Sequence, residues 1–222
     1  MLIPKSFFKG KIKVMIALSA LFLSCAGHHS VSLTREQATD PYEQGLAFLK
    51  QFKYGEAKAS FDKAIANNPE HKKAFYYRGT ARIELDQIDS AMVDFEKSLK
   101  LDQNYALGYV GKAQVYIKKK DFTEAMEQVS KAQELEPNNP EAFYQKGIIY
   151  GYLKKTQEGI ESFKKCLEVK PDHAYAHYQI GLAYYQAKRP DLTLVHLERF
   201  LILAPDAPEA EQVRRLLSSL RR

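Results

Sequence analysis

A period of 34 residues runs through most of this chain and constrains its fold more than any other feature. Five ladders repeat at this interval in one register: a set of small residues, a set that is mostly alanine, a set of large apolar residues, a second set of mostly small residues, and a set that is mostly proline. The first ladder consists of Gly45, Gly79, Ala113, Gly147 and Gly181. The ladder of large apolar residues consists of Phe61, Phe95, Val129, Phe163 and Leu197. A fixed period of this length indicates one supersecondary unit that is stacked many times.

Each period holds two apolar stretches with helical spacing, and a short turn such as Lys120-Asp121 separates them. Stretches of about 12 residues with this spacing predict a helix, a turn and a second helix. Small residues in both helices permit the paired helices to approach closely. Proline near the end of four of the five units stops the second helix. The sequence therefore predicts an all-α fold.

These ladders resemble the tetratricopeptide repeat. Its pattern has a large apolar residue at position four, an aromatic residue at position eleven, small residues at positions eight, twenty and twenty-seven, and proline at position thirty-two. The resemblance implies a right-handed α-solenoid of five 34-residue helix-turn-helix units, completed by a C-terminal capping helix. The five units would span residues 38–71, 72–105, 106–139, 140–173 and 174–207. The sequence departs from the pattern at Pro41, Arg82, Gln103 and Phe200, and the last of these lies where the array ends.

Residues 208–222 are predicted to form the capping helix and a basic tail. Val213, Leu216, Leu217 and Leu220 share one face of this helix, and charged residues occupy the other. A solenoid needs such a helix to cover its final apolar face.

The N-terminal segment has the features of a targeting signal. Residues 1–13 are basic, and residues 14–23 form an uncharged apolar stretch that, at about 1.5 Å per residue, covers only half of a bilayer core. This length suits a secretory signal peptide, here residues 1–24. The sequence Phe-Leu-Ser-Cys-Ala around Cys25 resembles the lipobox of bacterial lipoproteins, although Phe22 replaces the usual aliphatic residue. An ordinary cleaved signal and an uncleaved anchor remain the alternatives.

By that resemblance Cys25 would carry the lipid anchor, and residues 25–37 would be a flexible tether. The protein would be exported and anchored in the bacterial cell envelope. By the same resemblance, Ala26 rather than Asp after the cysteine implies the outer membrane, facing the periplasm, if the host has two membranes. Residues 1–24 contain four lysines and no acidic residue, so their removal lowers the net charge from +6 to +2. A nearly neutral mature chain gives no support to nucleic-acid binding.

No catalytic or metal-binding motif appears in the sequence. It lacks nucleophile-elbow, phosphate-loop, zinc-protease and paired Cys-x-x-Cys patterns. We therefore expect no enzymatic activity, no cofactor, no metal and no small-molecule substrate. Cys166 falls in a small-residue ladder and is interpreted as a buried apolar residue.

The concave face is the surface on which we expect function. In tetratricopeptide repeats it is lined by the first helix of each unit, at positions two, five, nine, twelve and thirteen, which share a helix face. Tyrosines and aliphatic residues occupy most of these positions here. The predicted groove residues are Tyr42, Leu46, Tyr76, Ile83, Val110, Ile117, Tyr144, Ile148, Tyr152, Tyr175, Tyr178, Leu182 and Tyr185.

An apolar stripe on a concave face predicts a binding site for another polypeptide, and tyrosine offers contact area together with a polar tip. The chain's own N-terminal or C-terminal segment could instead fill part of the groove. Chaperone-binding members of the family grip a terminal carboxylate with Lys and Asn at positions five and nine. Tyrosine and aliphatic residues prevail there in this chain, which argues against that class of partner.

The sequence thus predicts a membrane-tethered, non-catalytic scaffold or adaptor that binds a protein or peptide segment and serves the assembly of an envelope complex. It resembles the bacterial tetratricopeptide-repeat lipoproteins, which include type IV pilus pilotins and adaptors for peptidoglycan hydrolases. The alternative is a stoichiometric accessory subunit that positions a catalytic or secretion partner.

Overall fold

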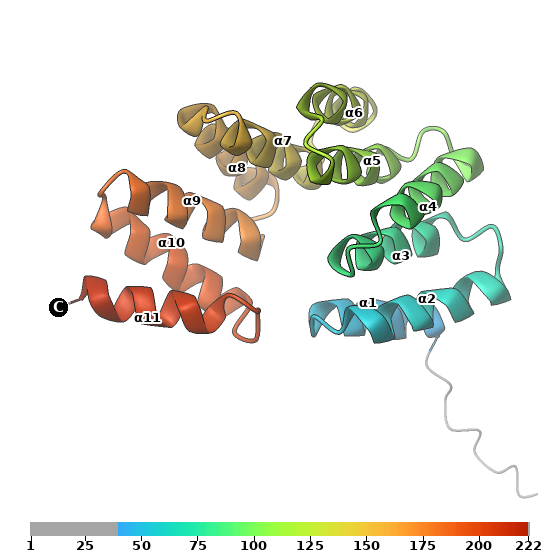
Figure 1. Cartoon of the computed structure of the whole chain (residues 1–222), viewed down its shortest axis with the longest axis horizontal. Helices are drawn as coiled ribbons and strands as arrows, with labels where there is room; N and C mark the ends of the chain where they lie inside the picture. Colours follow the sequence, from blue (N-terminus) through green and yellow to red (C-terminus); the bar gives the residue numbers. More distant parts are fainter. Residues whose placement is uncertain (1–39, 222) are drawn as a thin grey trace, which may run out of the picture. The chain divides into compact units, whose positions relative to one another are not determined.

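The computed structural model describes residues 40–221, which fold into eleven α-helices and contain no strand (Figure 1). The predicted signal peptide (1–24), the predicted lipidation site Cys25 and the predicted tether (25–37) lie outside the described residues. The helices are α1 (Pro41–Lys50), α2 (Tyr54–Asn67), α3 (Lys72–Glu84), α4 (Ile88–Leu101), α5 (Ala106–Lys118), α6 (Phe122–Leu135), α7 (Pro140–Tyr152), α8 (Thr156–Val169), α9 (Ala174–Gln186), α10 (Pro190–Leu203) and α11 (Ala210–Leu220).

The helices pack in the order of the sequence. Each odd-numbered helix from α1 to α9 pairs with the helix that follows it, and the second helix of every pair also contacts the first helix of the next. The helix α11 packs on α10 after the fifth pair, and it buries Val213 and Leu217. The predicted fold class, an all-α solenoid of helix-turn-helix repeats, is confirmed. No helix within residues 40–221 is both long and apolar enough to cross a membrane.

The ladder of small residues marks the closest contact inside each pair. A β-carbon placed on Gly45 would lie 2.5 Å from a ring carbon of Phe61, so only glycine fits there. The same clash would arise between Gly147 and the ring of Phe163. In the third unit the ladder has Ala113 instead, and the facing residue is the smaller valine rather than a phenylalanine. The larger residue in one ladder is thus matched by a smaller residue in the other, as close packing requires.

The turn inside each pair has one conformation that recurs with the 34-residue period. In the first turn the N–H of Phe52 donates to the carbonyl of Leu49, and the N–H of Lys53 donates to that of Phe48, both at 3.0 Å. These bonds define a Schellman motif, which needs a left-handed residue at its centre. The residues with positive φ at this position are Phe52, Asp86, Lys120, Lys154 and Lys188.

Phe52 differs from its four equivalents because it is bulky and apolar, whereas they are charged. A φ of 59° is unfavourable for such a side chain. Its ring packs against the apolar cluster of α10 and α11, which includes Phe200 and Val213. Figure 1 shows the α1–α2 turn facing the start of α11. The first and last units of the repeat array are therefore in contact.

Two histidines begin first helices. The Nδ1 atom of His71 accepts the N–H of Ala74 at 3.3 Å, and that of His173 accepts the N–H of Ala176 at 3.1 Å. Both histidines are therefore N-caps. Asp40 and Asn139 cap α1 and α7 in the same way, with a carboxylate or amide oxygen as the acceptor.

Candidate functional site

The structure divides the predicted groove residues into three groups by exposure. Four of them are buried, and for these the prediction of a surface position is wrong. Tyr76 and Ile83 pack with Val115 of the next unit, while Val110 and Ile117 pack with residues of α7. Consecutive first helices lie close together at these points, so each covers the inward face of its neighbour.

Most of the other predicted groove residues are half-buried. The ring of Tyr144 lies 5.6 Å from that of Phe163, and the ring of Tyr178 lies 4.9 Å from that of Phe200. Both tyrosines pack against core phenylalanines and remain partly exposed to solvent. The half-buried group is Tyr42, Leu46, Tyr144, Ile148, Tyr175, Tyr178 and Leu182.

Two predicted groove residues are openly exposed, Tyr152 at 58% and Tyr185 at 45%. Tyr152 closes α7, and its ring stacks on Phe122 at 5.2 Å between centroids. Tyr185 lies near the end of α9, beside Pro190 and Leu220. Large exposed aromatic side chains are the groups that a partner protein can cover at little cost in solvation.

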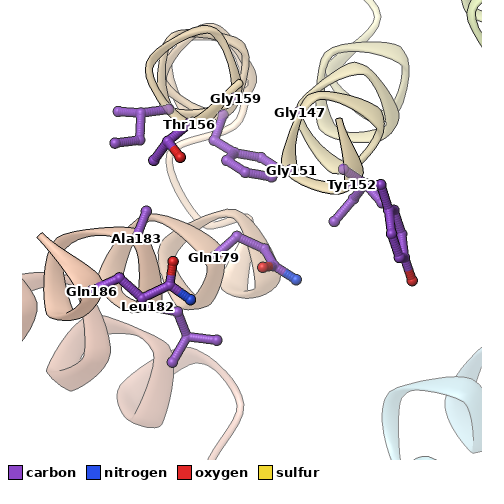
Figure 2. Close-up of a pocket in the computed structure, with 12 residues that line it drawn as sticks. Gly147, Gly151, Tyr152, Thr156, Gly159, Gln179, Leu182, Ala183 and Gln186 are labelled. Atoms are coloured by element: carbon purple, nitrogen blue, oxygen red, sulfur yellow. The ribbon is translucent and has the colours of Figure 1, made fainter. Parts of the chain in front are cut away.

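Tyr152 stands at the rim of a hollow of about 360 Å³, which three helices enclose (Figure 2). Ile148, Tyr152 and Leu182 are the three predicted groove residues that line it. The other lining residues are Gly147, Gly151, Thr156, Gly159, Ile160, Phe163, Gln179, Ala183 and Gln186. The volume falls within the range that small ligands and single large side chains occupy.

The hollow exists because the array opens at this point. The helix α1 approaches α3 closely, as α3 does α5 and α5 does α7, but α7 and α9 do not make this approach. Their facing surfaces stay apart, and α8 forms the floor between them. Figure 2 shows Gly151 and Tyr152 on one wall, with Gln179 and Leu182 across from them.

Sequence reasoning missed most of the lining residues. Gln186 occupies position thirteen, which the resemblance assigns to the concave face, but Gln179 occupies position six, which it does not. Gly159 stands at position twenty, where three of the other four units have alanine. The coincidence of glycine at positions twelve and twenty in one unit was the available signal, because it removes two side chains from the same place.

Carboxylates face the same side of the array as the tyrosines. The hydroxyl of Tyr175 donates to Oε2 of Glu209 at 3.1 Å. Burial and then the charge of Glu209 raise the pKa of Tyr178. Burial, followed by the charges of Glu84 and Glu209, raises the pKa of Tyr54 to about 12. Glu84 of α3 and Glu209 at the start of α11 therefore both raise the pKa of the same residue, Tyr54.

The described residues contain no group of three side chains suited to hold a metal ion. Cys166 is fully buried in the core cluster of α8 and α9, as its place in the small-residue ladder predicts. Burial raises the pKa of its thiol to about 12, so it is a poor nucleophile.

Two family models match the chain. The model described as tetratricopeptide repeat matches residues 42–106 and 144–210, which together make up more than half of the chain. The model described as anaphase-promoting complex, cyclosome, subunit 3 matches residues 84–166. No curated protein matches the sequence significantly.

Solved structures show the same fold at low sequence identity. The chain is similar to TTC0263, a thermophilic TPR protein of Thermus thermophilus, with a TM-score of 0.68 at 19% identity over 82% of this chain and 97% of that one. It is also similar to a chain of the APC/C hetero-tetramer Cut9-Hcn1, with a TM-score of 0.61 at 20% identity over 82% of this chain. The match spans 36% of that longer chain.

Proposed function

The chain belongs to the tetratricopeptide repeat family, and we propose that it is a membrane-tethered scaffold or adaptor that binds a segment of a partner protein between its fourth and fifth repeats. Proteins of this family are typically non-catalytic scaffolds for protein–protein interaction. The proposal adds to this general role a particular site, a lipid anchor and a place in an envelope complex.

The hollow between α7 and α9, with Tyr152 exposed at its rim, carries the proposal of the site. Buried tyrosines need no partner to explain them, because helix packing accounts for Tyr76 and for most of Tyr144. Tyr152 differs from them: its ring stacks on Phe122, but more than half of its surface remains exposed. Tyrosine is enriched among the residues that dominate the energetics of protein interfaces, and binding sites are preferentially concave.

Identification of the partner followed by an affinity measurement tests the site. Cross-linking in solubilised membranes and mass spectrometry would name the partner, and its affinity for the purified wild-type chain would then be compared with that for Tyr152→Ala. We expect a loss of about tenfold or more, as at an interface hot spot. Val93→Ala on α4 is the control, because this residue is 62% exposed outside the hollow. Equal losses for both variants would contradict the proposal.

The lipid anchor at Cys25 is the second part of the proposal, and the lipobox-like sequence before it supports it. Acyl chains contribute about 0.8 kcal/mol per buried methylene group, so several chains hold a protein on a membrane firmly. Intact mass of the membrane-bound protein tests this part. We expect a chain that begins at residue 25 and carries the mass of the lipid. An unmodified Cys25, or a chain that keeps residue 1, would contradict it.

A further inference from the structure

We propose that the hollow between α7 and α9 is an anchor pocket that takes one large uncharged side chain of an extended partner segment, and that it selects a basic residue three positions from that anchor. This inference rests on the proposed function and specifies the chemistry of the segment that the site binds.

The pocket contains a glycine that packing does not require. A β-carbon placed on Gly147 would meet the Phe163 ring at 2.5 Å, but one placed on Gly151 would meet nothing within 4 Å. Glycine inside a helix is less stable than alanine because it loses more conformational freedom on folding. The equivalent positions in the other units carry large side chains, namely Leu49, Ile83, Ile117 and Tyr185. Gly151 therefore keeps open a space that the repeat pattern would otherwise fill.

The walls of this space are chemically suited to an uncharged side chain. Ile148, Ile160 and Leu182 supply apolar surface, and the lining includes no Asp, Glu, Lys or Arg. Burial of a charged group against these walls would be costly because no opposite charge could compensate it. An aromatic or branched aliphatic side chain gains most from such a pocket.

Two glutamines set the conformation of the segment. Gln179 and Gln186 lie two helical turns apart on α9, on either side of Leu182, and both line the pocket. Seven residues of helix rise by about 10.5 Å, which is close to the length of about three residues of extended chain. A side-chain amide can donate to and accept from a backbone peptide group. The two amides can thus bind peptide groups three residues apart, with the anchor side chain between them.

Charge beyond the Gln179 end of the pocket selects the flanking residue. Tyr175 lies seven residues before Leu182 on α9, and its hydroxyl donates to Glu209. Glu209 forms no ion pair with Lys or Arg among residues 40–221. The distance along α9 from Tyr175 to Leu182 again corresponds to about three residues of extended chain. A lysine or arginine at that distance from the anchor would meet the carboxylate.

Synthetic peptides test the proposal directly. The probes are fluorescein-labelled nonapeptides of Gly and Ser, with Phe, Leu, Ser or Glu at the centre and with Lys, Ser or Glu placed three residues to either side. We expect binding to the full chain in detergent to be strongest with Phe or Leu at the centre and Lys at one flank, by about tenfold over Ser at the centre. Glu209→Gln should remove the preference for Lys and keep the preference for the apolar centre.

Gly151→Leu is the variant that decides, because it fills the pocket with the kind of side chain that the other units carry. We expect its melting temperature to match or exceed that of the wild type, while peptide binding falls about tenfold or more. Gly55→Leu is the matched control, since a β-carbon there also meets nothing within 4 Å and the residue lies outside the pocket. We expect this control to bind peptides like the wild type.

The outcomes separate this inference from the proposed function. Peptides that show no preference at the centre, or that bind Gly151→Leu as well as the wild type, overturn the anchor pocket. If none of these nonapeptides binds the wild type, the anchor pocket is overturned as well. If the identified partner still depends on Tyr152 in either case, the proposed function stands. A partner that binds independently of Tyr152 overturns the proposed function itself.

Discussion

Arg82 donates from Nη1 to Oδ2 of Asp94 at 2.7 Å, at the position where the repeat pattern has an aromatic residue. Asp94 is 1% exposed and also accepts two hydrogen bonds from Arg78, at 2.6 and 3.0 Å. Arg78 in turn donates to Asp62 of the preceding unit at 2.8 Å. An ionic network thus replaces aromatic packing at this point and joins α2, α3 and α4.

Asp94→Ala should be strongly destabilising, because it leaves two arginines partly buried without their shared partner. The loss of one member of such a buried pair costs roughly 3–5 kcal/mol. Asp89→Ala on the same helix is the control, since its side chain is 91% exposed and a solvent-exposed pair such as that with Lys119 contributes little to stability. Urea titrations monitored by circular dichroism would measure both. Similar losses for the two variants would show that the network does not stabilise the fold.

Gly147→Ala and Gly151→Ala should change stability in opposite directions, although the residues are one helical turn apart. The first places a methyl group against the Phe163 ring and should cost roughly 1–3 kcal/mol. The second meets open space and should stabilise the helix by about 0.5 kcal/mol. Thermal melts of the two variants provide the test. A stable Gly147→Ala protein would refute the assigned packing.

Phe163→Val should partly rescue Gly147→Ala. The third unit already combines Ala113 with Val129, so the fold accepts the smaller pair. We expect the double variant to be more stable than the sum of the single effects predicts, with a coupling of about 1 kcal/mol. A double-mutant cycle from urea titrations would detect this coupling, and strict additivity would contradict it.

Acidification should weaken the fifth repeat through His196. Burial and the charges of His177 and Lys164 lower the pKa of His196 from 6.5 to about 4. The Nδ1 atoms of the two histidines are 3.1 Å apart, and Nε2 of His177 donates to the carbonyl of Pro171 at 3.2 Å. While His177 is neutral, its Nδ1 therefore accepts from Nδ1 of His196. A proton on His177 would remove this acceptor, and a proton on His196 would place a charge in the partly buried pair.

The unfolded chain protonates His196 near pH 6.5, but the folded chain does so only near pH 4. The free energy of unfolding therefore falls as pH decreases through this interval and does not change further from this group below it. The full shift corresponds to about 3 kcal/mol, which partial exposure reduces to about 1 kcal/mol. Melting temperatures of the wild type and His196→Gln between pH 7.5 and 4.5 would measure the effect. Parallel curves for the two proteins would contradict it.

Ala125→Leu should damage the array on both sides of the third repeat. Ala125 is fully buried in the cluster that joins α5, α6 and α7, and overpacking costs roughly 1–3 kcal/mol. Since repeats depend on their nearest neighbours, amide exchange should accelerate in the second and fourth repeats as well. Ala47→Leu on the exposed side of α1 is the control and should leave exchange unchanged.

The helix pairs and their packing could be predicted from the sequence because each depends on residues within one period. Gly45 and Phe61 belong to the same unit, so their contact follows from the ladders alone. The exposure of groove residues could not be predicted, because it depends on the angle between units. Val110 is covered by the next repeat, whereas Tyr152, also on the concave face by register, remains exposed where α7 and α9 diverge. No single position in the sequence encodes that divergence.

The contact of Phe52 with the cluster of α10 and α11 changes how such an array must fold and unfold. A row of units that touch only their neighbours can lose its terminal units one at a time. Here Phe52 in the first turn packs on the apolar cluster of α10 and α11, so loss of either end of the array uncovers apolar surface of the other. We therefore expect the first and last units to unfold together, and their contact closes a loop of most of the chain, which is entropically costly.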